Sequence, residues 1–216
     1  MNIALIGAGN VGGALGGSWA RAGHSVRFGV RETGSDKTVA LLAATGPNAT
    51  AGTVAEAARA AEVVVLATPW KATEAVLQDA GDLRGKILID CTNPLKTTPG
   101  IGLELALGFT DSGAETVARW AAGARVVKAF NTYGWENFAD ARYPNAAGLK
   151  PLMFLAGDDA EAKETVARLA EAIGFECFDA GGLRAARELE PLTLIWIRAA
   201  LTSQRTAGFT WACLRR

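Results

Sequence analysis

Three glycines near the start of the chain are spaced for binding a phosphate group. Gly7, Gly9 and Gly12 form a G-x-G-x-x-G pattern within "IALIGAGNVGGALG". In such a turn one glycine permits a tight bend, one lets backbone amides approach a pyrophosphate, and one lets the next helix pack closely. The N-terminus of that helix offers free N–H groups and a partial positive charge. Because the pattern directly follows an apolar run of strand length, it predicts a dinucleotide site.

A second informative group follows about 20 residues later, in "FGVRETGSDK" at positions 28–37. A protein that binds NAD usually has an acidic residue here, which holds the ribose 2′-hydroxyl. In this chain Arg31 occupies the corner and Glu32 follows it. A guanidinium group binds a phosphate through several donors, and neighbours in an extended chain point to opposite sides. With Arg31 facing the ligand and Glu32 facing away, the corner favours NADP over NAD.

The other expected strand ends carry few groups for acid–base chemistry. Positions 68–70, 93–95 and 129–135 offer Thr, Asn and Tyr, but no histidine and no pair of carboxylates. Hydride transfer between two ring cofactors needs little more than alignment and exclusion of water. A carbonyl reductase would also need a proton donor, for which Tyr133 or Lys128 is available. Strand alternation places Lys128 opposite to Asn131 and favours a structural role, so no catalytic side chain is assigned.

Apolar runs of strand length alternate with Ala-rich stretches along the chain, which predicts a parallel sheet with helices on both faces. The expected strands are 2–7, 25–30, about 48–53, 62–68, 86–92 and 125–131. A loop is expected over 96–115 and a connection over 139–150. After the connection we expect a strand at 151–157, a helix at about 160–173, a strand at 175–180 and an apolar helix at about 185–201. We therefore predict an α/β fold, a Rossmann-type doubly wound parallel sheet with a small C-terminal α/β extension. Residues 1–150 would form the NADP-binding domain and residues 151–216 the small C-terminal domain.

Composition excludes several classes of protein. The 22 basic residues balance the 22 acidic ones, so no electrostatic attraction to nucleic acid or to an anionic membrane is expected. No apolar run approaches the roughly 20 residues that span a bilayer. Three separate cysteines and a single histidine suggest neither a disulfide framework nor a metal site. A soluble, cytoplasmic, metal-free protein is expected.

Six segments follow one another from the N-terminus to about residue 200: "GAGNVGGALG", "FGVR", "VVVLATPW", "LIDCTNPL", "VVKAFNTYGWENF" and "DAGGLRAARELEPLTLIWI". Together they resemble the NADPH-dependent coenzyme F-420 reductases (F-420:NADP oxidoreductases) and their bacterial homologues. The resemblance implies hydride transfer between NADPH and a deazaflavin. It also implies a Rossmann domain, a small C-terminal domain and, often, a homodimer.

The glycine pattern and the resemblance together assign positions to the ligands. The expected contacts of NADP(H) are Gly7, Ala8, Gly9, Asn10, Val11, Gly12, Val30, Arg31, Lys37, Thr68, Pro69, Trp70, Asn93, Pro94, Ala129 and Asn131. The expected contacts of the second substrate, coenzyme F-420 or a flavin, are Leu95, Phe130, Tyr133 and Trp135. The loop after Leu95 and the aromatics Tyr133 and Trp135 lie where that substrate should sit. For Trp70, packing and ligand contact are equally plausible interpretations.

Two other functions remain open from the sequence. One is an NADPH-dependent reductase of a small carbonyl or imine substrate; pyrroline-5-carboxylate reductase has a comparable N-terminal half, but a longer, all-helical second domain. The other is a non-catalytic NADP(H)-sensing module. Apolar residues at helical spacing in 185–201 suggest burial in the core or in a dimer interface. Glu188 and Glu190 beside them are expected to be solvated or capping charges.

Overall fold

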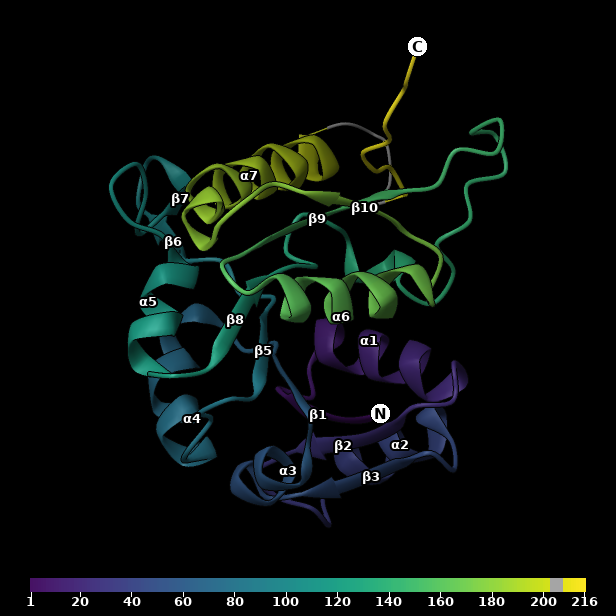
Figure 1. The fold of residues 1–216 in the computed structure, drawn as a ribbon, viewed down its shortest axis with the longest axis vertical. Helices are drawn as coiled ribbons and strands as arrows, with labels where there is room; N and C mark the ends of the chain where they lie inside the picture. The colour runs from purple at the N-terminus through teal and green to yellow at the C-terminus, as the bar shows by residue number, and fades with distance from the viewer. Residues whose placement is uncertain (203–207) are drawn as a thin grey trace.

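The computed structural model describes residues 1–202 and 208–216. Its centre is an eight-stranded sheet in the order β10-β9-β8-β5-β4-β1-β2-β3 (Figure 1). Neighbouring strands run parallel, except that β8 and β9 pair antiparallel. The strands are β1 (Asn2–Ile6), β2 (Ser25–Gly29), β3 (Ala49–Gly52), β4 (Val63–Leu66), β5 (Ile87–Asp90), β8 (Arg125–Lys128), β9 (Leu152–Gly157) and β10 (Glu176–Asp179). The predicted Rossmann-type α/β fold is confirmed.

Helices cover both faces of this sheet. They are α1 (Asn10–Arg21), α2 (Asp36–Thr45), α3 (Val54–Ala60), α4 (Thr73–Ala80), α5 (Gly113–Trp120), α6 (Ala160–Glu171) and α7 (Ala186–Thr202), with short 3-10 turns η1 (Trp70–Ala72), η2 (Trp135–Asn137) and η3 (Leu183–Ala185). Successive residues of a strand belong to different cores: Ile3 and Leu5 pack with α1 and α6, whereas Ala4 and Ile6 pack with α3, α4 and α5. Strands buried on both faces explain the nearly continuous apolar runs of the sequence.

One predicted loop is in fact ordered structure. The segment expected to be a loop over 96–115 contains the antiparallel hairpin of β6 (Leu95–Thr98) and β7 (Gly102–Leu105), and then the start of α5. Pro99 and Gly100 form the turn, where Gly100 has a φ of +79°. The prediction of a loop was wrong here because the strands are short and Gly-flanked, which weakens their pattern.

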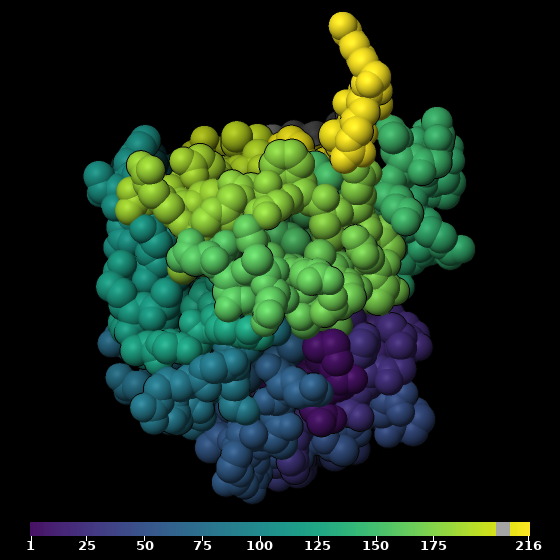
Figure 2. All heavy atoms as spheres, viewed as in Figure 1, coloured from purple at the N-terminus to yellow at the C-terminus, as the bar shows by residue number. Residues whose placement is uncertain are grey.

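The C-terminal third continues the same sheet, since β9 pairs with β8. Asp159 caps α6 by accepting a hydrogen bond from the Ala162 amide at 2.7 Å. Figure 2 shows residues of this third gathered at one end of the molecule, with the last residues projecting from it. The boundary at residue 150 stays a prediction. In the part of the chain that the structure describes, no helix has the length and apolar character needed to cross a membrane.

Candidate active site

Most of the predicted ligand contacts follow the ends of four parallel strands. In the sheet, Ile6 of β1 pairs with Leu66 of β4, Leu66 with Asp90 of β5, and Asp90 with Lys128 of β8. These four strands therefore end in one row. The segments that follow them, 7–12, 67–70, 91–95 and 129–135, lie along a single edge, and open α/β sheets bind ligands at that edge.

The glycine turn leaves room for a phosphate. Gly7 has a φ of +107°, and a Cβ placed on Gly12 would lie 1.8 Å from the Gly7 carbonyl oxygen. Both positions therefore require glycine, whereas a Cβ on Gly9 would have no atom within 4 Å. Gly9 is the N-cap of the 12-residue helix α1, whose first turn has no side-chain cap and no acidic residue. This free helix N-terminus suits an anionic ligand.

The corner after β2 presents positive charge to solvent. Val30 continues the sheet through a hydrogen bond from its amide to the Gly52 carbonyl, at 2.9 Å. Arg31 and Lys37 are exposed and have no hydrogen-bond or ion-pair partner among the described residues. Glu32 is exposed as well, and Ser35 caps α2 by accepting a hydrogen bond from the Thr38 amide. Two cationic side chains are thus available at the predicted 2′-phosphate position.

The segment after β4, residues 67–70, packs against the neighbouring helices α4 and α5. The Thr68 hydroxyl lies 3.3 Å from that of Thr73, and Pro69 is exposed. The ring of Trp70 stacks on Trp120 of α5, with 5.3 Å between ring centroids and 29° between the ring planes. Trp70 therefore has a packing role, and its contact with a cofactor stays a prediction.

Asn93 and Asn131 meet at the ends of β5 and β8. The Asn131 Nδ2 group, which has two hydrogens to donate, lies within hydrogen-bond distance of three acceptors: Asn93 Oδ1 at 3.2 Å, the Thr193 hydroxyl at 2.9 Å and the Leu189 carbonyl at 3.3 Å. These acceptors fix the orientation of the amide. Asn131 is only 4% exposed, yet its Oδ1 atom has no hydrogen-bond partner among the described residues. A buried acceptor without a donor is costly, so this atom suits the amide of a bound ligand.

The expected substrate contacts divide into buried and accessible residues. Phe130, 1% exposed, has a φ of +62° and packs edge-on against Trp19 in the aromatic core. Tyr133 is also buried, and its hydroxyl lies 2.9 Å from that of Tyr143. Leu95 is half-buried and Trp135 is exposed. The substrate role of all four residues stays a prediction. Because Phe130 and Tyr133 are buried, they could contact a substrate chiefly through their backbone atoms.

The candidate proton donors are both buried. Burial, together with the hydrogen bond that Tyr133 donates to Tyr143, raises the pKa of Tyr133 far above its usual value. For Lys128, burial by itself would lower the pKa, but the nearby charges of Asp90 and Glu190 outweigh burial and raise it. A group that holds its proton this firmly is a poor general acid near neutral pH. Neither residue is therefore assigned a catalytic step.

Sequence reasoning missed an ionic cluster beneath the strand ends. Lys128 Nζ lies 2.9 Å from Asp90 Oδ2 and 2.9 Å from Glu190 Oε1. Glu190 was expected to be solvated or capping; it does cap α5, through the Gly113 and Ala114 amides, but it is only 1% exposed. A lysine inside an apolar strand is the signal that could have revealed the cluster, because a buried ammonium group needs a carboxylate partner.

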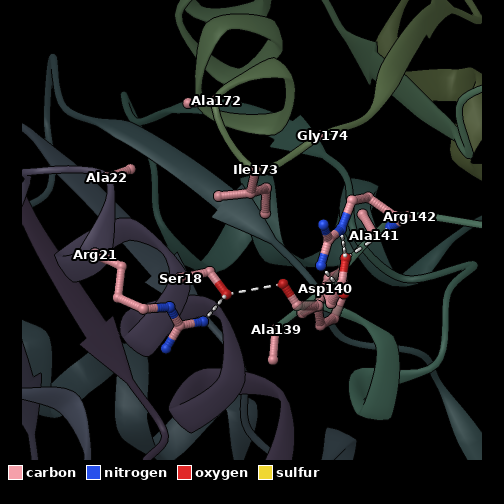
Figure 3. Close-up of a pocket in the computed structure, with 11 residues that line it drawn as sticks. Ser18, Arg21, Ala22, Ala139, Asp140, Ala141, Arg142, Ala172, Ile173 and Gly174 are labelled. Carbon is pink, nitrogen blue, oxygen red and sulfur yellow. Dashed lines mark hydrogen bonds and ion pairs between the residues drawn. The ribbon is translucent and has the colours of Figure 1, made fainter.

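A surface cavity of about 400 Å³ lies elsewhere, between the end of α1, residues 138–142 and the end of α6 (Figure 3). Inside it, Arg21 donates to the Ser18 hydroxyl, which donates to the Phe138 carbonyl. Arg142 is paired with Asp140. None of the predicted cofactor or substrate contacts lines this cavity, so it is separate from the strand-end site. No group of three or more potential ligand side chains within the described residues could hold a metal ion.

A doubly wound sheet with an open glycine turn, a cationic corner and converging strand ends defines a dinucleotide-dependent oxidoreductase of the Rossmann type. Residues 2–94 match the model of the family described as "NADP oxidoreductase coenzyme F420-dependent". The chain is 31% identical over 220 residues to the F420-dependent NADP reductase of Methanothermobacter marburgensis, covering 96% of each protein. It therefore belongs to this family and is an NADP oxidoreductase.

Two further comparisons describe the breadth of the likeness. The crystal structure of a candidate F420-dependent NADP reductase from Arthrobacter sp. FB24 superposes with a TM-score of 0.89, at 33% identity over the whole of both chains. The metalloreductase STEAP3 of Rattus norvegicus is 35% identical over 140 residues, which is 64% of this chain but 26% of that protein. The likeness to the F420-dependent reductases thus covers the whole chain, and the likeness to STEAP3 covers only part of it.

Proposed function

We propose that the protein catalyses hydride transfer between NADPH and coenzyme F-420. The observation that carries this proposal is the likeness, over 96% of both chains, to a protein named F420-dependent NADP reductase. The free helix N-terminus at Gly9 and the unpaired Asn131 Oδ1 atom support a dinucleotide at the strand ends. In the direction from NADPH, a hydride and a proton are taken up by the deazaflavin, and NADP⁺ is released.

Each part of the dinucleotide has a proposed partner. The amides of the first turn of α1 bind the pyrophosphate, and Arg31 with Lys37 binds the 2′-phosphate. Asn131 Oδ1 accepts a hydrogen bond from the nicotinamide carboxamide, which would satisfy its lone pairs. The role of these residues is to bind, orient and exclude water, because the two ring systems supply the redox chemistry.

We also propose that the second substrate lies between the β6–β7 hairpin and the segment after β8. Leu95 and Trp135 supply accessible apolar surface there. A planar deazaflavin or flavin can stack on such surface, whereas a small imine or ketone would need a proton donor as well. The buried state of Tyr133 and Lys128 therefore favours the ring cofactor as acceptor.

The test is turnover with a panel of acceptors. Purified protein is mixed with NADPH or NADH and, separately, with coenzyme F-420, FMN, FAD, a ferric chelate and small ketones or imines. We expect oxidation of NADPH with coenzyme F-420 well above the rate without protein. Reduction of a small carbonyl or imine without reduction of any flavin-like acceptor would refute the proposal. Binding of NADPH without turnover of any acceptor would instead support a sensor.

The protein is further proposed to form a homodimer in the cytoplasm, with a small-molecule partner and no nucleic acid. Support for a dimer comes from apolar side chains left exposed on α7, Ile195 at 57% and Leu201 at 78%. The equal numbers of basic and acidic residues argue against binding nucleic acid. Sedimentation of the purified protein tests the dimer: a species of twice the 22.5 kDa chain mass is expected, and a monomer at micromolar concentration would contradict it.

A further inference from the structure

The buried ionic cluster joins three segments that meet at the active-site edge. Asp90 ends β5, Lys128 ends β8, and Glu190 lies in the second turn of α7. Their side chains are 0%, 0% and 1% exposed. The cluster carries one ammonium and two carboxylates, and the excess negative charge faces the N-terminus of α5, where the Gly113 and Ala114 amides donate to Glu190. This placement is favourable for the helix dipole.

The same cluster holds the segment that leads to Asn93. Asp90 Oδ1 accepts hydrogen bonds from the Thr92 amide at 2.9 Å and from the Thr92 hydroxyl at 2.7 Å. Lys128 Nζ donates to the Thr92 carbonyl at 2.5 Å. Every polar group of Thr92 is therefore bound to the cluster. Since Thr92 immediately precedes Asn93, the cluster fixes the direction in which the chain leaves β5.

On the other side, the cluster fixes the turn of α7 that holds Asn131. Glu190 stands between Leu189, whose carbonyl accepts from Asn131 Nδ2, and Thr193, whose hydroxyl accepts from the same group. The Thr193 hydroxyl also bonds to the Asn131 carbonyl, at 3.1 Å. Loss of the Lys128–Glu190 contact would release this turn from β8. The two asparagines at the site thus share one buried support.

A buried ion pair is a weak source of stability, because desolvation of the charges offsets most of their attraction. Its directional bonds, however, fix geometry, and hydride transfer is sensitive to misplacement on the scale of an ångström. We propose that Lys128 and Glu190 are positioning residues of the NADP oxidoreductase reaction: through Thr92 and the 189–193 turn they align Asn93 and Asn131. The inference rests on the proposed function for its kinetic consequence, but not for its structural one.

The chain offers a matched control. Arg187 and Glu115 also tie α7 to α5 by an ion pair, with 2.7 Å between Arg187 Nη2 and Glu115 Oε1. Both side chains are 20% exposed, and neither forms a hydrogen bond to Thr92, Asn93 or Asn131 among the described residues. If the buried cluster only anchored α7, loss of either ion pair would change kcat to a similar extent. If the cluster positions the two asparagines, only its own loss should lower kcat.

The experiment compares Glu190→Gln and Lys128→Met with Arg187→Gln in the full chain. Glu190→Gln keeps the size of the side chain and one oxygen for capping α5, so it should fold even if Lys128→Met does not. We expect Glu190→Gln to lower kcat by about 10- to 100-fold with little change in KM for NADPH. Arg187→Gln should change kcat by less than about twofold.

Hydrogen exchange provides a readout that does not depend on turnover. In the protein without ligand, Glu190→Gln and Lys128→Met should speed exchange of the Thr92 amide, which donates to Asp90, while Arg187→Gln should not. Unchanged kcat in Glu190→Gln, or an equal loss in Arg187→Gln, would overturn the inference. If the unaltered protein transfers no hydride to coenzyme F-420, the proposed function fails, and the exchange rate of the Thr92 amide still decides whether the cluster holds the segment that leads to Asn93.

Discussion

Replacing Arg31 with alanine is expected to weaken recognition of NADPH far more than that of NADH. Arg31 is exposed, and no partner among the described residues holds its guanidinium. The substitution therefore removes a charge without breaking a contact of the fold. Only NADPH carries the 2′-phosphate that this charge would bind.

The magnitude follows from the exposure of the corner. A hydrogen bond to a charged group contributes about 1.5–3 kcal/mol, and solvent screening at an exposed site favours the lower end. About 1.5 kcal/mol corresponds to roughly a tenfold change in an equilibrium constant. We expect KM for NADPH to rise about tenfold in Arg31→Ala, and KM for NADH to change by less than about twofold. The difference should shrink at high salt.

Steady-state kinetics with both cofactors at two salt concentrations measure this effect. Arg84→Ala is a suitable control, since Arg84 is also exposed but pairs with Asp82 before β5, at the opposite edge of the sheet. Glu32→Gln should act in the opposite direction and lower KM for NADPH, because it removes a negative charge beside the phosphate. An equal rise in KM for NADPH and NADH in Arg31→Ala would show that Arg31 does not recognise the 2′-phosphate.

Three further substitutions test the glycine turn and the ion pair between Glu115 and Arg187. Gly12→Ala would place a methyl group 1.8 Å from the Gly7 carbonyl oxygen, so the turn must move. The overpacking should lower the free energy of unfolding by about 1–3 kcal/mol or more, and Tm with it. NADPH affinity should fall as well, because the amides of the turn are displaced. The methyl group of Gly9→Ala meets no protein atom, so this variant should raise KM for NADPH with a much smaller fall in Tm than Gly12→Ala. Similar melting curves for the two variants would contradict this expectation. The hydrogen bond from Arg187 chiefly lowers the pKa of Glu115 below its usual 4.5, so this carboxylate stabilises the fold above that pH and loses its contribution as the pH falls further. The Tm deficit of Glu115→Gln should therefore be larger at pH 7 than at pH 3, and a deficit independent of pH would refute that role.

The sheet was predictable from sequence because each central strand is buried on both faces. Such strands are short, rich in Val, Ile and Leu, and bounded by residues that form turns, so they stand out from the Ala-rich helices. Their order of appearance and the glycine turn then place the strand ends on one edge. The hairpin after Leu95 was missed, since its strands are only partly buried and one begins at a glycine, which gives no regular alternation.

The buried contacts that hold Asn93 and Asn131 were harder to predict from the sequence than the two asparagines themselves. Asn93 and Asn131 could be identified because each follows an apolar strand. Their connection through α7 depends on contacts between residues 38 to 62 positions apart, and no local pattern records a contact over that range. Glu190 was expected to be solvated or capping because charged residues are mostly exposed. Only the fold shows that it pairs with the lysine inside β8.

Transfer of a hydride from NADPH to coenzyme F-420 can be followed directly in solution. Purified protein is mixed with NADPH and oxidised coenzyme F-420, and the absorbance of both compounds is followed with time. We expect the two compounds to be consumed in equal amounts, at a rate proportional to protein concentration. If neither is consumed in this mixture, but NADPH is oxidised in a second mixture that holds a small imine or ketone in place of coenzyme F-420, the proposed function is wrong.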